Sequence, residues 1–199
     1  HVLGAEAGER VLDVCAAPGS KTTHIAALTP GIELLVAGDL YGHRLRTVLE
    51  SARRTGADGR IHALVHDAVE ALPFAAQSFE RVLVDAPCSG TGTLRRNPEI
   101  RWRISSEDMI ELSERQRRIL SNAARTVRPK GRLVYSTCSV ETEENEAVVA
   151  AFLQEQPEFR QVAVQAPPRL MSEDGVAARI WPQRDGADGF YLAAFERIA

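Results

Sequence analysis

The chain has 199 residues, of which 44% are hydrophobic and 26% charged, and its net charge is −3. This length is sufficient for one domain with a sizeable core, and no apolar run approaches the roughly 18 residues of a membrane-spanning helix. The three cysteines lack the spacing of a metal site or of a disulfide framework. We therefore expect a soluble protein of the reducing cytoplasm, without a membrane partner. The negative charge provides no general attraction to nucleic acid, so any such contact must depend on a local basic patch.

In the first half of the chain, short apolar segments alternate with segments of helical character, and polar residues follow each apolar segment. Strands are predicted at residues 10–15, 33–38, 61–65 and 81–84, and helices at 21–28 and 44–55.

The second half contains one long helical stretch and several shorter elements. Residues 106–127 are predicted as a helix that is capped by Ser105 or Ser106 and stopped by residues 129–131. A strand at 132–135, a helix at 142–154 and strand-like segments at 161–164 and 189–195 follow. This alternation predicts an α/β fold with a parallel, doubly wound sheet, and such sheets bind ligands at the carboxyl ends of their strands.

A small-residue turn follows the first strand. Small side chains at residues 15–20 let a ligand approach the backbone, and the next helix offers free amides that favour an anionic group. Tight packing alone would also explain such a turn. Asp39 lies 20 positions after Gly19. In dinucleotide-binding folds, an acidic residue at this position forms hydrogen bonds with the ribose hydroxyls. Because the turn lacks the glycine pattern of NAD sites and of P-loops, a nucleoside without pyrophosphate is favoured. Asp67 is a candidate for an adenine amino group, or a simple helix cap.

Two cysteines are expected at the same edge of the sheet. Cys88 lies in the DAPCSGTG segment at 85–92, after the fourth strand, and Cys138 lies in the TCS segment at 137–139, after the fifth. Taken singly, each cysteine could be a small buried hydrophobic residue. Together with Asp85 they are candidates for nucleophilic catalysis.

Arginines surround a tryptophan directly after the first cysteine loop. Arg95, Arg96 and Arg101 could contact phosphates while Trp102 stacks on a base, although a solvated arginine surface with a core tryptophan is the alternative. Further along, residues 115–118 carry three arginines that we interpret as an ordinary charged helix face. The histidines show no arrangement typical of a metal site, so no metal is expected.

Several segments, distributed over nearly the whole chain, resemble the motifs of the RNA cytosine carbon-5 methyltransferase family in the family's order. These segments are VLDVCAAPGSKT, RVLVDAPCSGTGTLRRNPEIRW, GRLVYSTCSVETEENEAVV and DGFYLAAFER. The LRRNPEIRW string most resembles the bacterial small-subunit ribosomal RNA methyltransferase B group. The resemblance implies a Rossmann-like class I fold with an antiparallel last strand, S-adenosylmethionine (SAM) as cofactor, and RNA as partner, with rRNA favoured over tRNA. We expect a monomer.

The resemblance also assigns roles to residues. Cys138 would be the nucleophile, Cys88 would help to resolve the covalent adduct, and Asp85 would face the target base. The cofactor-binding residues would be Cys15, Ala16, Ala17, Pro18, Gly19, Ser20, Lys21, Asp39, Asp67 and Asp85. Carbon 5 of cytosine is a weak nucleophile, and a thiolate added at carbon 6 raises its electron density, which explains the need for a cysteine.

Three other classes were weighed. A non-catalytic SAM- or RNA-binding assembly factor would not need both cysteines and Asp85. An amino-group methyltransferase usually carries an Asn/Asp-Pro-Pro-aromatic loop in place of residues 85–88, and a DNA cytosine enzyme would use the cysteine of the fourth-strand loop. Methylation of tRNA rather than rRNA stays open. Only residues 2–9 precede the first strand, so we expect that an N-terminal RNA-binding region is missing from a single catalytic domain spanning 1–199.

Overall fold

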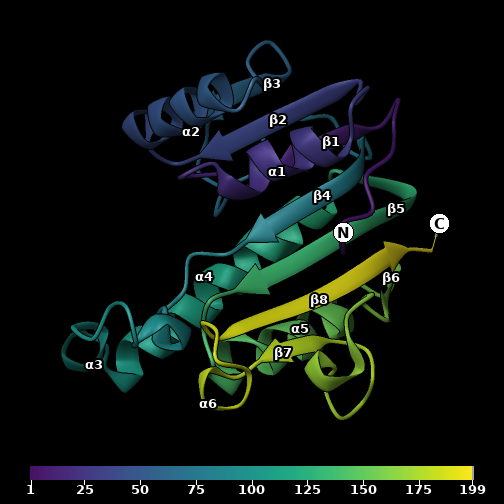
Figure 1. The fold of residues 1–199 in the computed structure, drawn as a ribbon. Coiled ribbons are helices and arrows are strands. Elements are labelled where there is room, and N and C mark those ends of the chain that lie inside the picture. The colour runs from purple at the N-terminus through teal and green to yellow at the C-terminus, as the bar shows by residue number, and fades with distance from the viewer. Residues whose placement is uncertain (199) are drawn as a thin grey trace.

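The strands assemble into one eight-stranded sheet (Figure 1). The computed structural model describes residues 1–198. The strand order is β3-β2-β1-β4-β5-β8-β6, and β7 pairs with β8 off this path. The strands are β1 (Arg10–Asp13), β2 (Leu34–Asp39), β3 (Ile61–Val65), β4 (Phe79–Asp85), β5 (Val127–Thr137), β6 (Phe159–Val162), β7 (Ala178–Ile180) and β8 (Phe190–Arg197).

The direction of the strands divides the sheet into two parts. The first five strands are parallel to one another, whereas β8 runs antiparallel to β5, β6 and β7. This arrangement confirms the predicted α/β class, with a mostly parallel sheet and an antiparallel last strand.

Helices cover both faces of the sheet because successive strand residues point to opposite sides. In β2, Leu35 and Ala37 belong to one buried cluster and Val36 to the other. The first cluster includes residues of α1 (Ser20–Leu28) and α2 (Gly42–Arg54), and the second includes residues of α4 (Ser106–Ala124) and α5 (Glu146–Glu155). The short elements are η1 (Thr91–Thr93), α3 (Ile100–Arg103), η2 (Thr142–Glu144), η3 (Pro168–Leu170) and α6 (Pro182–Asp185).

The boundary between α4 and β5 differs from the prediction. Helix α4 ends at Ala124 rather than at 127, and residues 129–131 lie inside β5 instead of stopping the helix. Val127 is fully buried and pairs with Phe79, so it belongs to the sheet and not to the helix. Lys130 has a φ of 62°, and the β4–β5 register shifts in this region. This irregularity accommodates the Pro-Lys-Gly segment within the strand. At the other end of α4, Ser105 is the N-cap and forms a capping box with Asp108.

The helix predicted at 142–154 is divided into η2 and α5. Asn145 separates them with φ −115° and ψ −95°, outside helical geometry. Helices α3 and α6 and strand β7 were not predicted, since each has only three or four residues. No helix within residues 1–198 has both the length and the apolar character needed to cross a membrane.

Candidate active site

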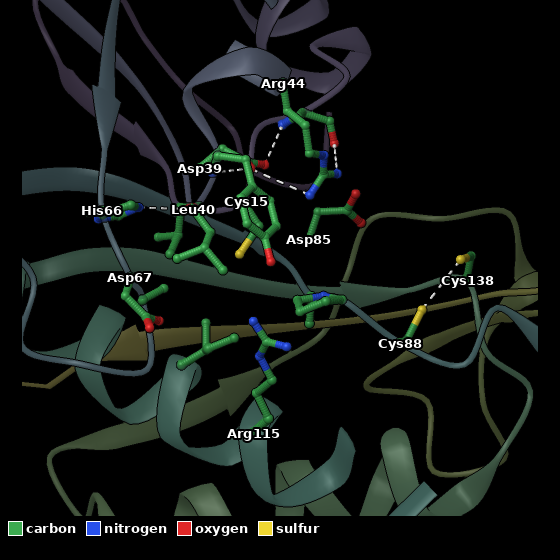
Figure 2. Close-up of a pocket in the computed structure, with 17 residues that line it drawn as sticks. Cys15, Asp39, Leu40, Arg44, His66, Asp67, Asp85, Cys88, Arg115 and Cys138 are labelled. Carbon is green, nitrogen blue, oxygen red and sulfur yellow. Dashed lines mark hydrogen bonds and ion pairs between the residues drawn. The ribbon is translucent and has the colours of Figure 1, made fainter. Parts of the chain in front are cut away.

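A pocket of about 300 Å³ opens at the carboxyl ends of the parallel strands (Figure 2). Segments that follow five different strands reach it. Cys15, Asp39 and Asp67 come from the first three strands, and Cys88 and Cys138 follow β4 and β5. Apolar walls are provided by Val14, Leu40, Pro87 and Ile119. Seven of the predicted cofactor and catalytic residues therefore line one cavity: Cys15, Ala17, Asp39, Asp67, Asp85, Cys88 and Cys138.

Two glycines close in sequence to the residues of this region are closely packed against other side chains. Gly19 has a φ of 105°, and a Cβ at this position would lie 2.9 Å from the Val48 Cα. A Cβ on Gly38 would lie 2.3 Å from Nε2 of His66, whose ring is fixed by a 3.0 Å hydrogen bond with the Val14 carbonyl. The turn after β1 is thus closely packed, and its role in holding a ligand stays a prediction.

The remaining residues of the turn have different positions. Ala17 lines the pocket, while the Ala16 amide donates to the Gly38 carbonyl, 2.7 Å away. Ser20 begins α1, and Pro18, like Ser20, is not among the residues that line the cavity. Burial raises the pKa of the Cys15 thiol well above its ordinary value, so Cys15 contributes packing rather than a nucleophile.

Asp39 is placed at the end of β2 by a dense set of contacts. Its side chain is only 4% exposed. The Ala17 and Tyr41 amides donate to its two carboxylate oxygens over 3.3 and 3.1 Å, and Arg44 forms an ion pair with it at 3.4 Å. Arg44, which also lines the pocket, was missed by the sequence analysis because nothing in α2 distinguishes it from the other arginines of that helix. The contacts fix the carboxylate toward the cavity.

Asp67 forms a turn at the edge of the pocket, and the predicted contact with adenine stays a prediction. Its Oδ1 accepts a 2.9 Å hydrogen bond from the Val69 amide, as a turn-forming residue does. It also lines the pocket at the opposite end from Cys138.

Arg115 corrects the prediction of an ordinary charged face on α4. Its guanidinium points from α4 into the pocket (Figure 2), which it lines together with Ile119, one helical turn further on. Arg117 and Arg118, in contrast, form exposed ion pairs with Glu155 and Glu70, as expected of a solvated face. The i, i+4 spacing from the buried Ile119 was the available signal.

Asp85 links α1 to the end of β5. Its Oδ2 lies 2.5 Å from the Lys21 ammonium, and its Oδ1 accepts a 2.6 Å hydrogen bond from the Ser136 hydroxyl. These two contacts orient the carboxylate at the pocket wall, between α1 and the end of β5. Below it, Asp13 is fully buried, accepts from the Thr22 hydroxyl over 2.6 Å, and has a pKa that burial raises to about 7.

The two cysteine sulfurs lie 3.3 Å apart (Figure 2). The hydrogen bond with Cys88 lowers the pKa of Cys138, whereas the same bond and burial raise the pKa of Cys88. A pair in which Cys88 donates its proton toward a Cys138 thiolate is consistent with both directions.

The candidate RNA-binding residues lie outside this pocket. Arg95 and Arg96 both form ion pairs with Asp188. Arg101 and Trp102 lie on α3, and Trp102 is 83% exposed, which contradicts a core tryptophan. In Figure 1, α3 projects from the body of the protein on the side of the carboxyl ends of β4 and β5.

Comparison with known proteins gives consistent matches over the whole chain. The family model of the 16S rRNA methyltransferases RsmB/F matches residues 1–196. A ribosomal RNA small subunit methyltransferase B of Thermus thermophilus is 41% identical, over 99% of this chain and 47% of the relative. A probable enzyme of the same name from Bacillus subtilis is 38% identical, over 99% of this chain and 45% of the relative. The chain thus spans just under half the length of these relatives.

Solved structures support the same grouping. The crystal structure of PH0851 has a TM-score of 0.92 and 38% identity, covering 98% of this chain and 44% of that one. NSun6 from Pyrococcus horikoshii with SFG has a TM-score of 0.89 and 26% identity, covering 100% of this chain and 50% of that one. The fold is that of SAM-dependent methyltransferases, and the chain belongs to the RsmB/F family of 16S rRNA methyltransferases.

Proposed function

We propose that this chain is the catalytic part of a SAM-dependent methyltransferase that modifies carbon 5 of cytosine in RNA, with 16S rRNA as the substrate. The observation that carries the proposal is the thiol pair: Cys88 and Cys138 come from loops after different strands, yet their sulfurs lie 3.3 Å apart at the pocket that Asp39 and Asp67 also line. The names of the matched relatives support rRNA as substrate.

The residues present fit SAM. Asp39 offers a carboxylate to the ribose hydroxyls, and Asp67 offers one to the adenine amino group. Leu40 and Ile119 supply apolar surfaces for the adenine ring. Helix α1 begins directly after Gly19, and the free amides at its N-terminus favour a carboxylate. When bound, SAM supplies an activated methyl group and a positively charged sulfonium.

Cys138 begins the reaction as the attacking thiolate. Its sulfur forms a bond to carbon 6 of cytosine, and the electron pair of the 5,6 double bond moves toward carbon 5 and the ring. Asp85, oriented by Ser136 and Lys21, faces the ring nitrogen, and a proton shared between the two stabilises the negative charge that develops on the ring. The Lys21 ammonium is a nearby source of positive charge. Carbon 5 thereby becomes the nucleophile for the methyl group that bound SAM would supply, with the neutral thioether as leaving group.

Cys88 acts in the second half of the reaction. A base removes the proton from carbon 5, the double bond reforms, and the bond between Cys138 and carbon 6 breaks with the electron pair returning to sulfur. The Cys88 thiol, 3.3 Å away, donates a hydrogen bond to the departing thiolate and so stabilises it as a leaving group.

The RNA must present an accessible base, because a paired cytosine cannot enter such a pocket. Trp102 is available for base stacking, since it is 83% exposed beyond the pocket. Arg95, Arg96 and Arg101 lie in the same segment and are exposed to solvent, where they can contact phosphates.

The test is product identification. The chain is incubated with SAM carrying a deuterated methyl group and, in separate arms, with 16S rRNA or tRNA, and the nucleosides are analysed by mass spectrometry. We expect labelled 5-methylcytidine in the rRNA arm, none with Cys138→Ser, and wild-type levels with Asp58→Ala, an exposed acid remote from the pocket. Label on the cytosine amino group would refute the reaction, and label in tRNA alone would refute the substrate.

A further inference from the structure

Beneath the two catalytic loops lies a buried carboxylate that the reaction described above does not use. Glu144, the last residue of η2, has no exposed surface. It accepts 2.8 Å hydrogen bonds from the Ser89 amide and from Nε2 of Gln116, and a further bond from the Ser89 hydroxyl. Since Ser89 adjoins Cys88, Glu144 fixes the loop that carries this thiol.

The next residue fixes the other loop. The Thr137 hydroxyl donates to Oδ1 of Asn145 over 2.6 Å, and Nδ2 of Asn145 donates to the Ser139 carbonyl over 3.0 Å. These two partners flank Cys138 on either side. Two adjacent residues therefore anchor both cysteine loops, and this use of Asn145 explains why the backbone departs from helical geometry at that position.

The chemistry around Glu144 suits an anion. All three of its side-chain contacts are donors, as a carboxylate requires, and among the ion pairs of residues 1–198 none includes Glu144. Its charge is therefore not neutralised by a cation, and in a buried setting it acts strongly on neighbouring groups.

The two thiols experience different surroundings. The pKa of Cys88 is raised by its hydrogen bond with Cys138, by burial and by the charge of Cys138. The charge of Glu144 raises it further. The pKa of Cys138 is lowered overall, first by the hydrogen bond with Cys88; burial and the Asp85 charge raise it, and the Lys21 charge lowers it again. The remaining titratable group in contact with this cluster is Tyr135, whose hydroxyl donates to the Glu144 carbonyl over 2.6 Å and whose pKa burial raises well above its usual value.

We propose that Glu144 is a positioning residue that differentiates the two thiols, so that Cys88 keeps its proton and Cys138 becomes the thiolate. The catalytic meaning of this role rests on the proposed function, but the role itself concerns only the state of the two cysteines. It can therefore be measured in the absence of RNA and SAM, and its failure would not affect the assignment of the reaction.

The experiment is competitive alkylation. The folded chain is treated with limiting iodoacetamide between pH 6 and pH 9, and the label on the peptides of Cys88 and Cys138 is quantified by mass spectrometry. In the wild type we expect Cys138 to be labelled preferentially. Glu144→Gln removes the charge at nearly constant size, and we expect the ratio of Cys138 to Cys88 labelling to fall by on the order of tenfold, the equivalent of one unit of relative pKa. The neighbouring exposed Glu143→Gln is the matched control and should keep the wild-type ratio.

A wild-type ratio in folded Glu144→Gln, as judged by circular dichroism and thermal unfolding, would overturn the proposal. If this variant does not fold, Ser89→Ala provides the test, since it retains both the charge and the contact of the carboxylate with the amide of residue 89. The proposal requires Ser89→Ala to keep the preference for Cys138. Loss of the preference there would show that the hydroxyl, and not the charge of Glu144, differentiates the thiols.

Discussion

Replacing Asp39 with asparagine tests the cofactor site. The aspartate has two carboxylate oxygens that accept amide hydrogen bonds from Ala17 and Tyr41 and an ion pair from Arg44, and each oxygen keeps a lone pair for a ribose hydroxyl. Asparagine substitutes a donor for one acceptor and removes the charge. A hydrogen bond to a charged acceptor contributes roughly 1.5–3 kcal/mol, so the loss of one should weaken SAM binding on the order of 10- to 100-fold, at about 1.4 kcal/mol per factor of ten.

Isothermal titration calorimetry with SAM measures this directly. The surface variant Asp58→Asn serves as control and should bind like the wild type. Because Asp39 is buried, thermal unfolding of Asp39→Asn must be followed in parallel, and we expect a cooperative transition that is lowered by only several degrees. A dissociation constant equal to that of the wild type, in a folded variant, would refute the role of Asp39 at the ribose.

Three further outcomes follow from the structure. Gly19→Ala should lower the melting temperature by several degrees, because a Cβ would lie 2.9 Å from the Val48 Cα and φ is 105°; an unchanged transition would contradict the packing argument. Asp13 has a pKa raised from 3.8 to about 7 by burial, so its folded state holds the proton more tightly than the unfolded state and stability should fall as the pH rises from about 4 to 7. At about 1.4 kcal/mol per pKa unit, this loss of stability amounts to a few kcal/mol. Asp13→Asn should therefore have a higher melting temperature than the wild type at pH 8 but not at pH 4. If differential scanning fluorimetry shows no such difference between the two pH values, Asp13 is not a buried protonated acid. Trp102→Ala should raise the KM for RNA several-fold without changing melting temperature or SAM affinity, whereas the exposed Ile110→Ala on α4 should change none of these; equal RNA kinetics in both variants would remove the stacking role.

The sequence was sufficient to predict the parallel part of the sheet. In β1, β2 and β4 a run of mostly buried apolar residues ends in a polar one, as at Asp39 and Asp85, and this pattern is local. The start of β5 could not be predicted from the local sequence, because Val127 could continue the apolar stripe of α4 equally well. Only its pairing with Phe79, 48 positions earlier, decides between helix and strand.

The candidate site shows the same distinction. Residues on the turns directly after strands could be predicted, because the carboxyl ends of parallel strands meet at one edge. Arg44 and Arg115 reach the pocket from helices rich in arginine, and no feature of the chain near Arg44 distinguishes it. The buried position of Glu144 could not be predicted for a different reason. Its partners lie 28 and 55 positions away, and a glutamate at the start of a helix normally faces solvent.

The nucleophile is the central claim, and trapping with 5-fluorocytosine RNA tests it most directly. Fluorine at carbon 5 blocks release of the adduct, so the chain should form a stable complex with the RNA in the presence of SAM. Peptide mass spectrometry should locate the linked nucleotide on Cys138; Cys138→Ser should form no complex, and Cys88→Ala should still form one. A complex linked through Cys88, or equal trapping by the wild type and Cys138→Ser, would contradict the account.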